Sequence, residues 1–374
     1  MDLELITLDG EHNGTDPATV RDLLSSGTCF WMDLSGDDVA AAPAATLLRD
    51  VFGFHPLAIE DAEHFGQRPK VDTYPDFTLL VLYGATRGGR LVEVHCFFAP
   101  GFIVTVHHHA CPELQSVAQR LQRSMSERST VAGAPPPAAA TSPSPVVVLH
   151  HIVDALIDGY FPVLAALDDR IDALEDEILR RPTEAQLGDL FDMKRSLIAM
   201  RKIVTPQRDM FATLLGARDA LPGMDADAER YFRDLYDHLI RISDLVDSYR
   251  DLVSGALDTH LSTVSNRLNV VMKQLTIIAT IFLPLSFLTG FFGQNFGWMV
   301  DRLTSFPVFV GVGIGVQILV VVGLVVFFRR RGWTSTDGTV AAAAPSRRPR
   351  TSAHDRWHLL GVLEPDRPSP GTAR

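Results

Sequence analysis

The sequence predicts an α+β domain, a long helical stalk and two transmembrane helices, and three observations lead to this fold class. Residues 275–293 and 306–328 are two apolar stretches without charge. A helical pattern without a breaker runs into the first stretch from about residue 225. The N-terminal part instead alternates short β-branched and aromatic runs with turn residues. Because about 20 apolar residues in a helix cross a bilayer core, the two apolar stretches are expected in a membrane.

Residues 1–146 are predicted to form the α/β domain. The predicted strands are residues 28–33, 77–83, 91–98 and 102–107, and the predicted helices are residues 18–25 and 44–51. Residues 127–146 are rich in Pro, Ala and Ser and are expected to be a flexible insert. The first residues lack the basic and apolar pattern of a signal peptide, so we expect this domain in the cytoplasm.

Helical patterns follow the insert. Residues 147–218 predict two antiparallel outer helices, 148–180 and 184–218, because Pro182 interrupts the pattern. Residues 225–293 predict one stalk helix that continues into the first span. A helix of roughly 60 residues is about 90 Å long, and its apolar stripe needs partners. Residues 329–374 begin with a basic end and continue as a tail that is expected to be disordered.

The two spans are expected to form a hairpin joined by an external loop over residues 294–305. Three arginines follow the second span at residues 329–331, and Arg267 and Lys273 precede the first. The loop carries one basic and one acidic residue. The positive-inside rule therefore predicts a multi-pass protein of the plasma or inner membrane with both termini in the cytoplasm.

Composition argues against several function classes. The formal net charge of -11 disfavours a nucleic-acid binder, which needs a basic face. Three cysteines without regular spacing do not predict a disulfide framework. The sequence shows no nucleophile with its base, no phosphate-binding glycine loop and no nucleotide fingerprint. We therefore expect no enzyme activity, no nucleotide and no organic cofactor.

His107, His108 and His109 lie next to Cys111 and have the composition of a metal cluster. Neighbouring residues in a strand point to opposite faces, so three consecutive histidines cannot all reach one ion. We therefore expect a strand end at this position and no zinc site.

Three stretches of the chain carry a recognisable pattern. They are HPLAIED with QRPKV at residues 55–61 and 67–71, YFRDLYDH with RDLVSG at residues 231–238 and 250–255, and the run from residue 269 to 296 that contains GQN. Together they resemble the CorA family of magnesium and cobalt transporters over about residues 1–333. The resemblance implies a homopentameric funnel in the lipid bilayer. Physics also favours an oligomer, because two helices cannot enclose an aqueous path.

In this resemblance, Gly293, Gln294 and Asn295 form the ion-selecting mouth. Mg²⁺ gives up its waters reluctantly, so neutral amides suit a hydrated ion that must also leave. Asn295 is expected to accept hydrogen bonds from ion-bound water, and Gly293 to allow a sharp turn at the helix exit. Polar or pliable residues share one helical face below and are expected to line the pore: Asn269, Met272, Leu275, Ala279, Leu283 and Ser286. The alternative is a packing stripe without conduction, which leaves the polar members unexplained.

The mouth departs from the family pattern, which has Gly-Met-Asn preceded by Tyr. This chain has Gln294 in the middle and Phe292 before the glycine. The resemblance implies a channel that conducts Mg²⁺, with Co²⁺ or Ni²⁺ as further cargo, down its electrochemical gradient. Related branches with other middle residues are associated with zinc. A zinc or broader cation transporter therefore stays open, as does a membrane sensor or scaffold that does not conduct.

The resemblance also implies regulation, because in this family cytoplasmic Mg²⁺ binds between neighbouring subunits and favours the closed state. The matching positions are Asp61, with Glu60 beside it, and Asp234 on the stalk helix; Asp158 or Asp154 is a further candidate. Carboxylates that share an interface repel each other when empty, and a divalent ion relieves the repulsion. The alternative is that these acids are solvated surface groups.

Overall fold

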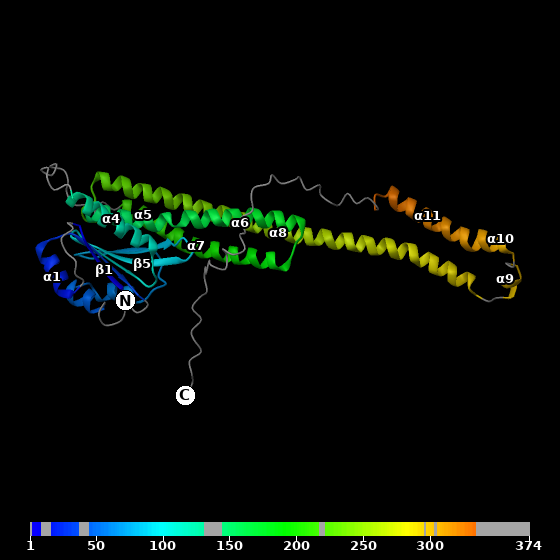
Figure 1. The fold of residues 1–374 in the computed structure, drawn as a ribbon, viewed down its shortest axis with the longest axis horizontal. Helices are drawn as coiled ribbons and strands as arrows, with labels where there is room; N and C mark the ends of the chain where they lie inside the picture. The colour runs from blue at the N-terminus through cyan, green and yellow to red at the C-terminus, as the bar shows by residue number, and fades with distance from the viewer. Residues whose placement is uncertain are drawn as a thin grey trace, which may run out of the picture. The chain divides into compact units, whose positions relative to one another are not determined.

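Figure 1 shows the fold in the computed structural model, which describes residues 2–8, 16–36, 45–130, 144–216, 221–294, 297–302 and 305–333. The chain divides into two compact units. Among the described residues, unit 1 comprises those up to residue 177 and residues 183–257. Unit 2 comprises residues 178–182 and the described residues from 258 onwards.

A six-stranded mixed sheet forms the centre of unit 1, in the order β1-β2-β6-β5-β4-β3. The strands are β1 (Asp2–Thr7), β2 (Phe30–Ser35), β3 (Lys70–Thr73), β4 (Thr78–Ala85), β5 (Leu91–Phe98) and β6 (Phe102–His107). Only β2 and β6 are parallel neighbours among these strands. The four predicted strands are confirmed with shifts of up to two residues. β1 and β3 were not predicted, and both are edge strands, where polar residues weaken the apolar pattern.

Capped helices position the segments that carry the HPLAIED and QRPKV runs. α1 (Pro17–Ser26) and α3 (Pro56–Glu63) each begin with a proline, whose missing N–H costs nothing at a helix start. His55 Nδ1 accepts the N–H of Leu57 at 3.2 Å and caps α3. The π-helix η1 (Leu47–Val51) precedes α3, and the Phe54 ring that follows η1 stacks on Phe97 of β5 at 4.3 Å.

The structure corrects the first predicted outer helix. In place of one helix over residues 148–180 it has α5 (Pro145–Asp158) and α6 (Tyr160–Arg180), which meet at Gly159. Pro162 has no N–H to donate to the carbonyl of Asp158, so a continuous α-helix would lose a hydrogen bond there. Gly159 also lies against β4, and a Cβ at this position would stand 1.9 Å from the Ala85 carbonyl oxygen.

The predicted insert at residues 127–146 is helical at both ends. α4 (Pro112–Thr130) includes its first residues, and α5 starts at Pro145. Residues 131–143 lie outside the described residues.

α7 (Glu184–Gly216) is the second predicted outer helix, and one of its side chains joins it to the sheet. Gln207 is buried, and its Oε1 accepts the N–H of Tyr83 at 2.8 Å. Its Nε2 donates to the Tyr83 carbonyl oxygen at 3.1 Å. The amide therefore satisfies both backbone groups of one residue in β4.

α8 (Ala226–Phe292) is a single helix of 67 residues, as the absence of a breaker predicted. Its residues up to Leu257 belong to unit 1 and bury one stripe at steps of three, four and seven. The buried stripe is Phe232, Leu235, Leu239, Ile242, Val246, Val253 and Ala256. Pro284 lies inside the helix and does not end it.

Unit 2 contains the rest of α8 and three short or medium helices. These are α9 (Gly297–Arg302), α10 (Phe306–Val308) and α11 (Gly315–Arg330), with the π-helix η2 (Phe309–Ile314) between α10 and α11. α9 lies in the predicted external loop. In the described part of the chain, three helical stretches are long and apolar enough to cross a membrane. The apolar window of the stretch Pro145–Arg180 is 56% buried inside the protein, against 0% for α8 and for Phe306–Arg330.

Candidate functional site

The predicted mouth begins where α8 ends. The N–H of Gly293 donates to the Thr289 carbonyl at 3.0 Å, and the N–H of Gln294 donates to the Phe291 carbonyl at 3.2 Å. Gly293 is not among the glycines with positive φ, so the structure does not show the sharp turn expected for it. A Cβ at Gly293 would stand 3.1 Å from the Thr289 oxygen, a tight contact with the last turn of the helix. Asn295 lies outside the described residues.

The six predicted pore-lining residues lie on α8 within unit 2, and all are exposed in the single chain. The largest are Leu283, Met272 and Leu275, with exposed fractions of 72%, 61% and 60%. At about 100° per residue, the six positions fall within an arc of roughly 120°. The structure therefore keeps them on one face of a helix and leaves that face uncovered.

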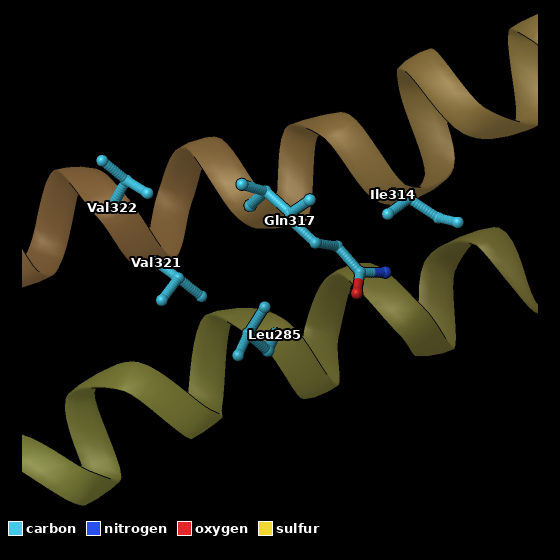
Figure 2. A pocket seen from close by; sticks show the side chains of 6 residues that line it. Leu285, Ile314, Gln317, Val321 and Val322 are labelled. Atoms are coloured by element: carbon cyan, nitrogen blue, oxygen red, sulfur yellow. The ribbon is translucent and has the colours of Figure 1, made fainter.

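A different face of α8 contacts the second span. Leu285 lines an apolar pocket together with residues of η2 and α11, which are Ile314, Gln317, Ile318, Val321 and Val322. Figure 2 shows Leu285 directed from α8 towards α11 and the amide of Gln317 extending from α11 to α8. Gln317 Nε2 donates to Thr289 Oγ1 at 3.4 Å. Leu285 stands about 140° from the centre of the predicted pore face, so packing within one chain leaves that face free.

A group of possible metal ligands lies in unit 1, between α5 and α8. Oxygens of Asp154 and Asp158 and a ring nitrogen of His238 lie within 4.8 Å of one another. Asp234 is one helical turn before His238, and its Oδ2 is 3.8 Å from His238 Nε2. Partial burial and the neighbouring Asp154 raise the pKa of Asp158. The structure therefore brings Asp158 and Asp234 to the same histidine.

His238 was not among the residues predicted from the sequence for this cluster. The signal was the spacing of four between Asp234 and His238, and again between Asp154 and Asp158, which places each pair on one helix face. The packing of α5 on α8 that joins the two pairs is not visible in the sequence.

Asp61 has a different partner. Its Oδ2 lies 2.6 Å from Lys70 Nζ, and Lys70 also lies 3.0 Å from Asp72. Partial burial lowers the pKa of Lys70, but hydrogen bonds to the two carboxylates outweigh this effect and the net direction is upward. The adjacent Glu60 is exposed. Among the described residues, no group of three possible ligands includes Asp61 in the single chain.

The histidines near Cys111 are directed to different partners. His107 is buried and its Nε2 lies 3.1 Å from Asp33 Oδ2. The ring of His108 packs edge-on against Phe65 at 4.1 Å. His107 therefore belongs to the domain interior, whereas His108 packs at its edge, and the two rings have different partners.

Comparisons with known proteins cover most of the chain. A family model described as CorA-like Mg²⁺ transporter protein matches residues 26–330. The chain is 33% identical over 332 residues to the cobalt/magnesium transport protein CorA of Thermotoga maritima, covering 86% of this chain and 88% of that protein. It is 32% identical over 306 residues to the putative metal ion transporter YfjQ of Bacillus subtilis, covering 81% and 89%.

Two further similarities bear on cargo and fold. The zinc transport protein ZntB of Yersinia enterocolitica is 29% identical over 244 residues, covering 64% of this chain and 69% of that protein. The solved structure of the CorA magnesium transporter from Methanocaldococcus jannaschii matches with a TM-score of 0.67 at 20% identity, covering 82% and 91%. At that identity the match concerns the fold alone, and it confirms the predicted α/β domain, long helix and apolar C-terminal helices.

Proposed function

Because the chain belongs to the family of CorA-like Mg²⁺ transporters and is a membrane transporter of divalent cations, we propose that it conducts Mg²⁺ passively. Co²⁺ and Ni²⁺ are further proposed cargo. The observation that carries the proposal is the uncovered face of α8 from Asn269 to Ser286, which ends one to two turns before Gly293. Polar residues on a membrane helix are costly against lipid, so this face is better explained by an aqueous path.

We infer a homopentamer in which this face surrounds a common axis. The family resemblance supports the number five, and the uncovered face of α8 supports an arrangement of several copies. In the ring, Met272 and Leu275 form an apolar constriction that gates by losing its water. Asn269 and Asn295 form polar rings towards the two ends of the path.

The mouth selects a hydrated ion. Mg²⁺ holds its waters tightly in an octahedron, and the amides of Gln294 and Asn295 offer oxygens that accept hydrogen bonds from those waters. Neutral acceptors bind weakly enough to let the ion leave, which conduction requires. Both termini lie in the cytoplasm, and the membrane potential drives entry with about 2.3 kcal/mol per charge per 100 mV, twice that for a divalent ion.

Ion uptake into vesicles tests this function. We expect the reconstituted protein to load Mg²⁺-sensitive dye, and Asn295→Ala to abolish the flux because the ring of amides is lost. Asn266→Ala is the matched control, since Asn266 is an exposed asparagine on the same helix outside the pore-lining arc. Absence of flux with Mg²⁺, Zn²⁺ and Co²⁺ alike would contradict the proposal and support a sensor or scaffold.

A zinc transporter is the second candidate, favoured by Gln294 and by the similarity to ZntB. An amide in the middle of the tripeptide adds an acceptor where the family has a thioether. Parallel uptake with Zn²⁺-sensitive dye separates the two candidates. Gln294→Met, which restores the family tripeptide, should raise the ratio of Mg²⁺ to Zn²⁺ uptake if Gln294 broadens selectivity.

We also propose that Asp61, with Glu60, and Asp234, with Asp158, bind regulatory Mg²⁺ across neighbouring subunits. In the single chain Lys70 neutralises Asp61, and His238 lies beside Asp158 and Asp234. A bound Mg²⁺ therefore takes the place of Lys70 and of His238 as the partner of these carboxylates. Asp61→Asn and Asp234→Asn should weaken the protection from proteolysis that Mg²⁺ gives the purified protein. Asp192→Asn is the control, because Asp192 is an exposed acid paired with Arg195. Unchanged protection in both variants would refute the regulatory role.

A further inference from the structure

Gln317 is the one strongly polar side chain among the residues from Phe306 to Phe328, all described. An unpaired amide in hydrocarbon is costly, so a glutamine at this depth needs a partner. Its Nε2 donates to Thr289 Oγ1 at 3.4 Å, and Figure 2 shows the amide reaching α8. The side chain therefore joins the second span to the first within unit 2.

Thr289 is itself bonded to the mouth. Its hydroxyl donates to the Leu285 carbonyl at 2.8 Å while it accepts from Gln317, so it is used as donor and acceptor. Its own carbonyl accepts the N–H of Gly293 at 3.0 Å. Gln317 is thus connected to the first residue of the tripeptide through a single intervening residue.

The surroundings of the hydrogen bond between Gln317 and Thr289 are apolar, so the bond is what gives this contact a defined direction. Leu285, Ile318, Val321 and Val322 line an apolar hollow beside Gln317. Dispersion contacts across a gap are weak and have no direction, whereas an amide bonded to a hydroxyl has a defined geometry. A second hydrogen bond, from Lys273 Nζ to the Gly332 carbonyl, joins the residues that flank the two spans and lies 16 residues away along α8. Gln317 therefore supplies a directional contact between the two spans close to the mouth.

We propose that Gln317 is a positioning residue for ion selection. By holding Thr289 it fixes the last turn of α8, and with it the height and orientation at which Gly293 and Gln294 meet a hydrated cation. The inference rests on the proposed function of α8 as the pore-lining helix. Sites that discriminate by geometry tolerate displacements of only about 0.5 Å, so loosening this turn lowers selectivity while the spans stay in the membrane.

The test measures Mg²⁺ and Zn²⁺ uptake in vesicles that contain equal amounts of assembled protein. Gln317→Leu and Thr289→Val each remove the bond with little change in volume, and each should change the uptake ratio by about 3- to 10-fold, the range expected for one interhelical hydrogen bond. The double variant should show no more than the larger single effect, because both changes break the same bond. Thr289→Ser keeps the hydroxyl and should retain the ratio of the unchanged protein.

Thr280→Val is the matched control. The Thr280 hydroxyl donates to the Thr276 carbonyl at 2.7 Å in the same manner as Thr289, but Gln317 bonds Thr289. An unchanged ratio in assembled Thr289→Val protein would overturn the proposal and leave Gln317 as a contact that only joins helices. Multiplying effects in the double variant would overturn it too. Loss of flux in Asn295→Ala tests the proposed function separately, so failure of the two ideas is distinguishable.

Discussion

The two units of this chain bury apolar side chains in different ways. In unit 1 the sheet and its helices enclose a core in which Leu79, Phe97 and Val104 have no exposure. In unit 2 large apolar residues remain exposed, as Leu319 does at 74%. Leu57 of unit 1 is also exposed, at 59%. A single exposed leucine is ordinary on a protein surface, whereas the continuous exposed apolar surface of unit 2 indicates contact with lipid or another subunit.

Polar groups show the same contrast. In unit 1 the carboxylate of Glu93 accepts hydrogen bonds from the N–H groups of Gly66 and Gln67 and from the Tyr83 hydroxyl, and it lies 2.8 Å from a His95 ring nitrogen. Such a satisfied network holds the segment after α3 on the sheet and needs no ligand. In the spans of unit 2, polar side chains are few: the threonines of the first span bond carbonyls of α8, Gln317 bonds Thr289, and Ser286 lies on the uncovered face. A polar group thus has several partners in unit 1, whereas in the spans it depends on the helix backbone, a single neighbour or an aqueous path.

The largest effect is expected when arginine replaces the exposed Leu319 of unit 2, with the exposed Leu57 of unit 1 as the comparison. Leu319→Arg should raise the free energy of membrane insertion by about 3 kcal/mol and so make insertion less favourable, because the charge enters hydrocarbon. Leu57→Arg should change stability by less than about 0.5 kcal/mol, since the charge enters water. The measurement is the fraction of full-length protein recovered in the membrane at equal synthesis. Equal recovery of the two variants would contradict the conclusion that Leu319 lies in the membrane and Leu57 does not.

A smaller effect is expected at Gly159. Gly159→Ala places a methyl group against the Ala85 carbonyl, and β4 and α5 must separate to accept it. We expect the free energy of unfolding of unit 1 to fall by about 2 kcal/mol. Gly188→Ala is the control, because nothing lies within 4 Å of a Cβ there. Thermal unfolding of the full chain in detergent measures both, and a control as damaging as Gly159→Ala would contradict this explanation of the helix break.

The smallest effect concerns His107. Burial lowers its pKa, but the hydrogen bond and charge of Asp33 outweigh burial, so the net direction is above 6.5. A raised folded-state pKa means that this pair stabilises the fold fully below about pH 6.5 and that the contribution is lost as pH rises through the folded-state value. Relative to His107→Gln, the unchanged protein should lose about 1 kcal/mol of unfolding free energy between about pH 6 and pH 9. An equal loss of unfolding free energy in His107→Gln over this pH range would contradict the role of the pair.

The sequence predicts most of the fold because its strongest signals are local. Length and lack of charge identify both spans, and spacing identifies the face of α8 from Asn269 to Ser286. Features that depend on tertiary contact were missed or changed. The break at Gly159 depends on the closeness of β4, and the meeting of Asp158 with His238 depends on how α5 packs on α8. The bond from Gln317 to Thr289 likewise depends on how the second span packs on the first.

The bonds from Gln207 to Tyr83 have a consequence for solubility. Among the described strands, β3 pairs with β4 only from Thr78 to Val81, and the following residues of β4 have no described strand neighbour on that side. Free backbone groups on an apolar strand offer a template on which another chain can add a strand and start aggregation. The Gln207 amide occupies one N–H and one C=O of this stretch, and thereby acts as a one-residue substitute for a longer β3. Gln207 of α7 thus blocks the addition of another strand at Tyr83.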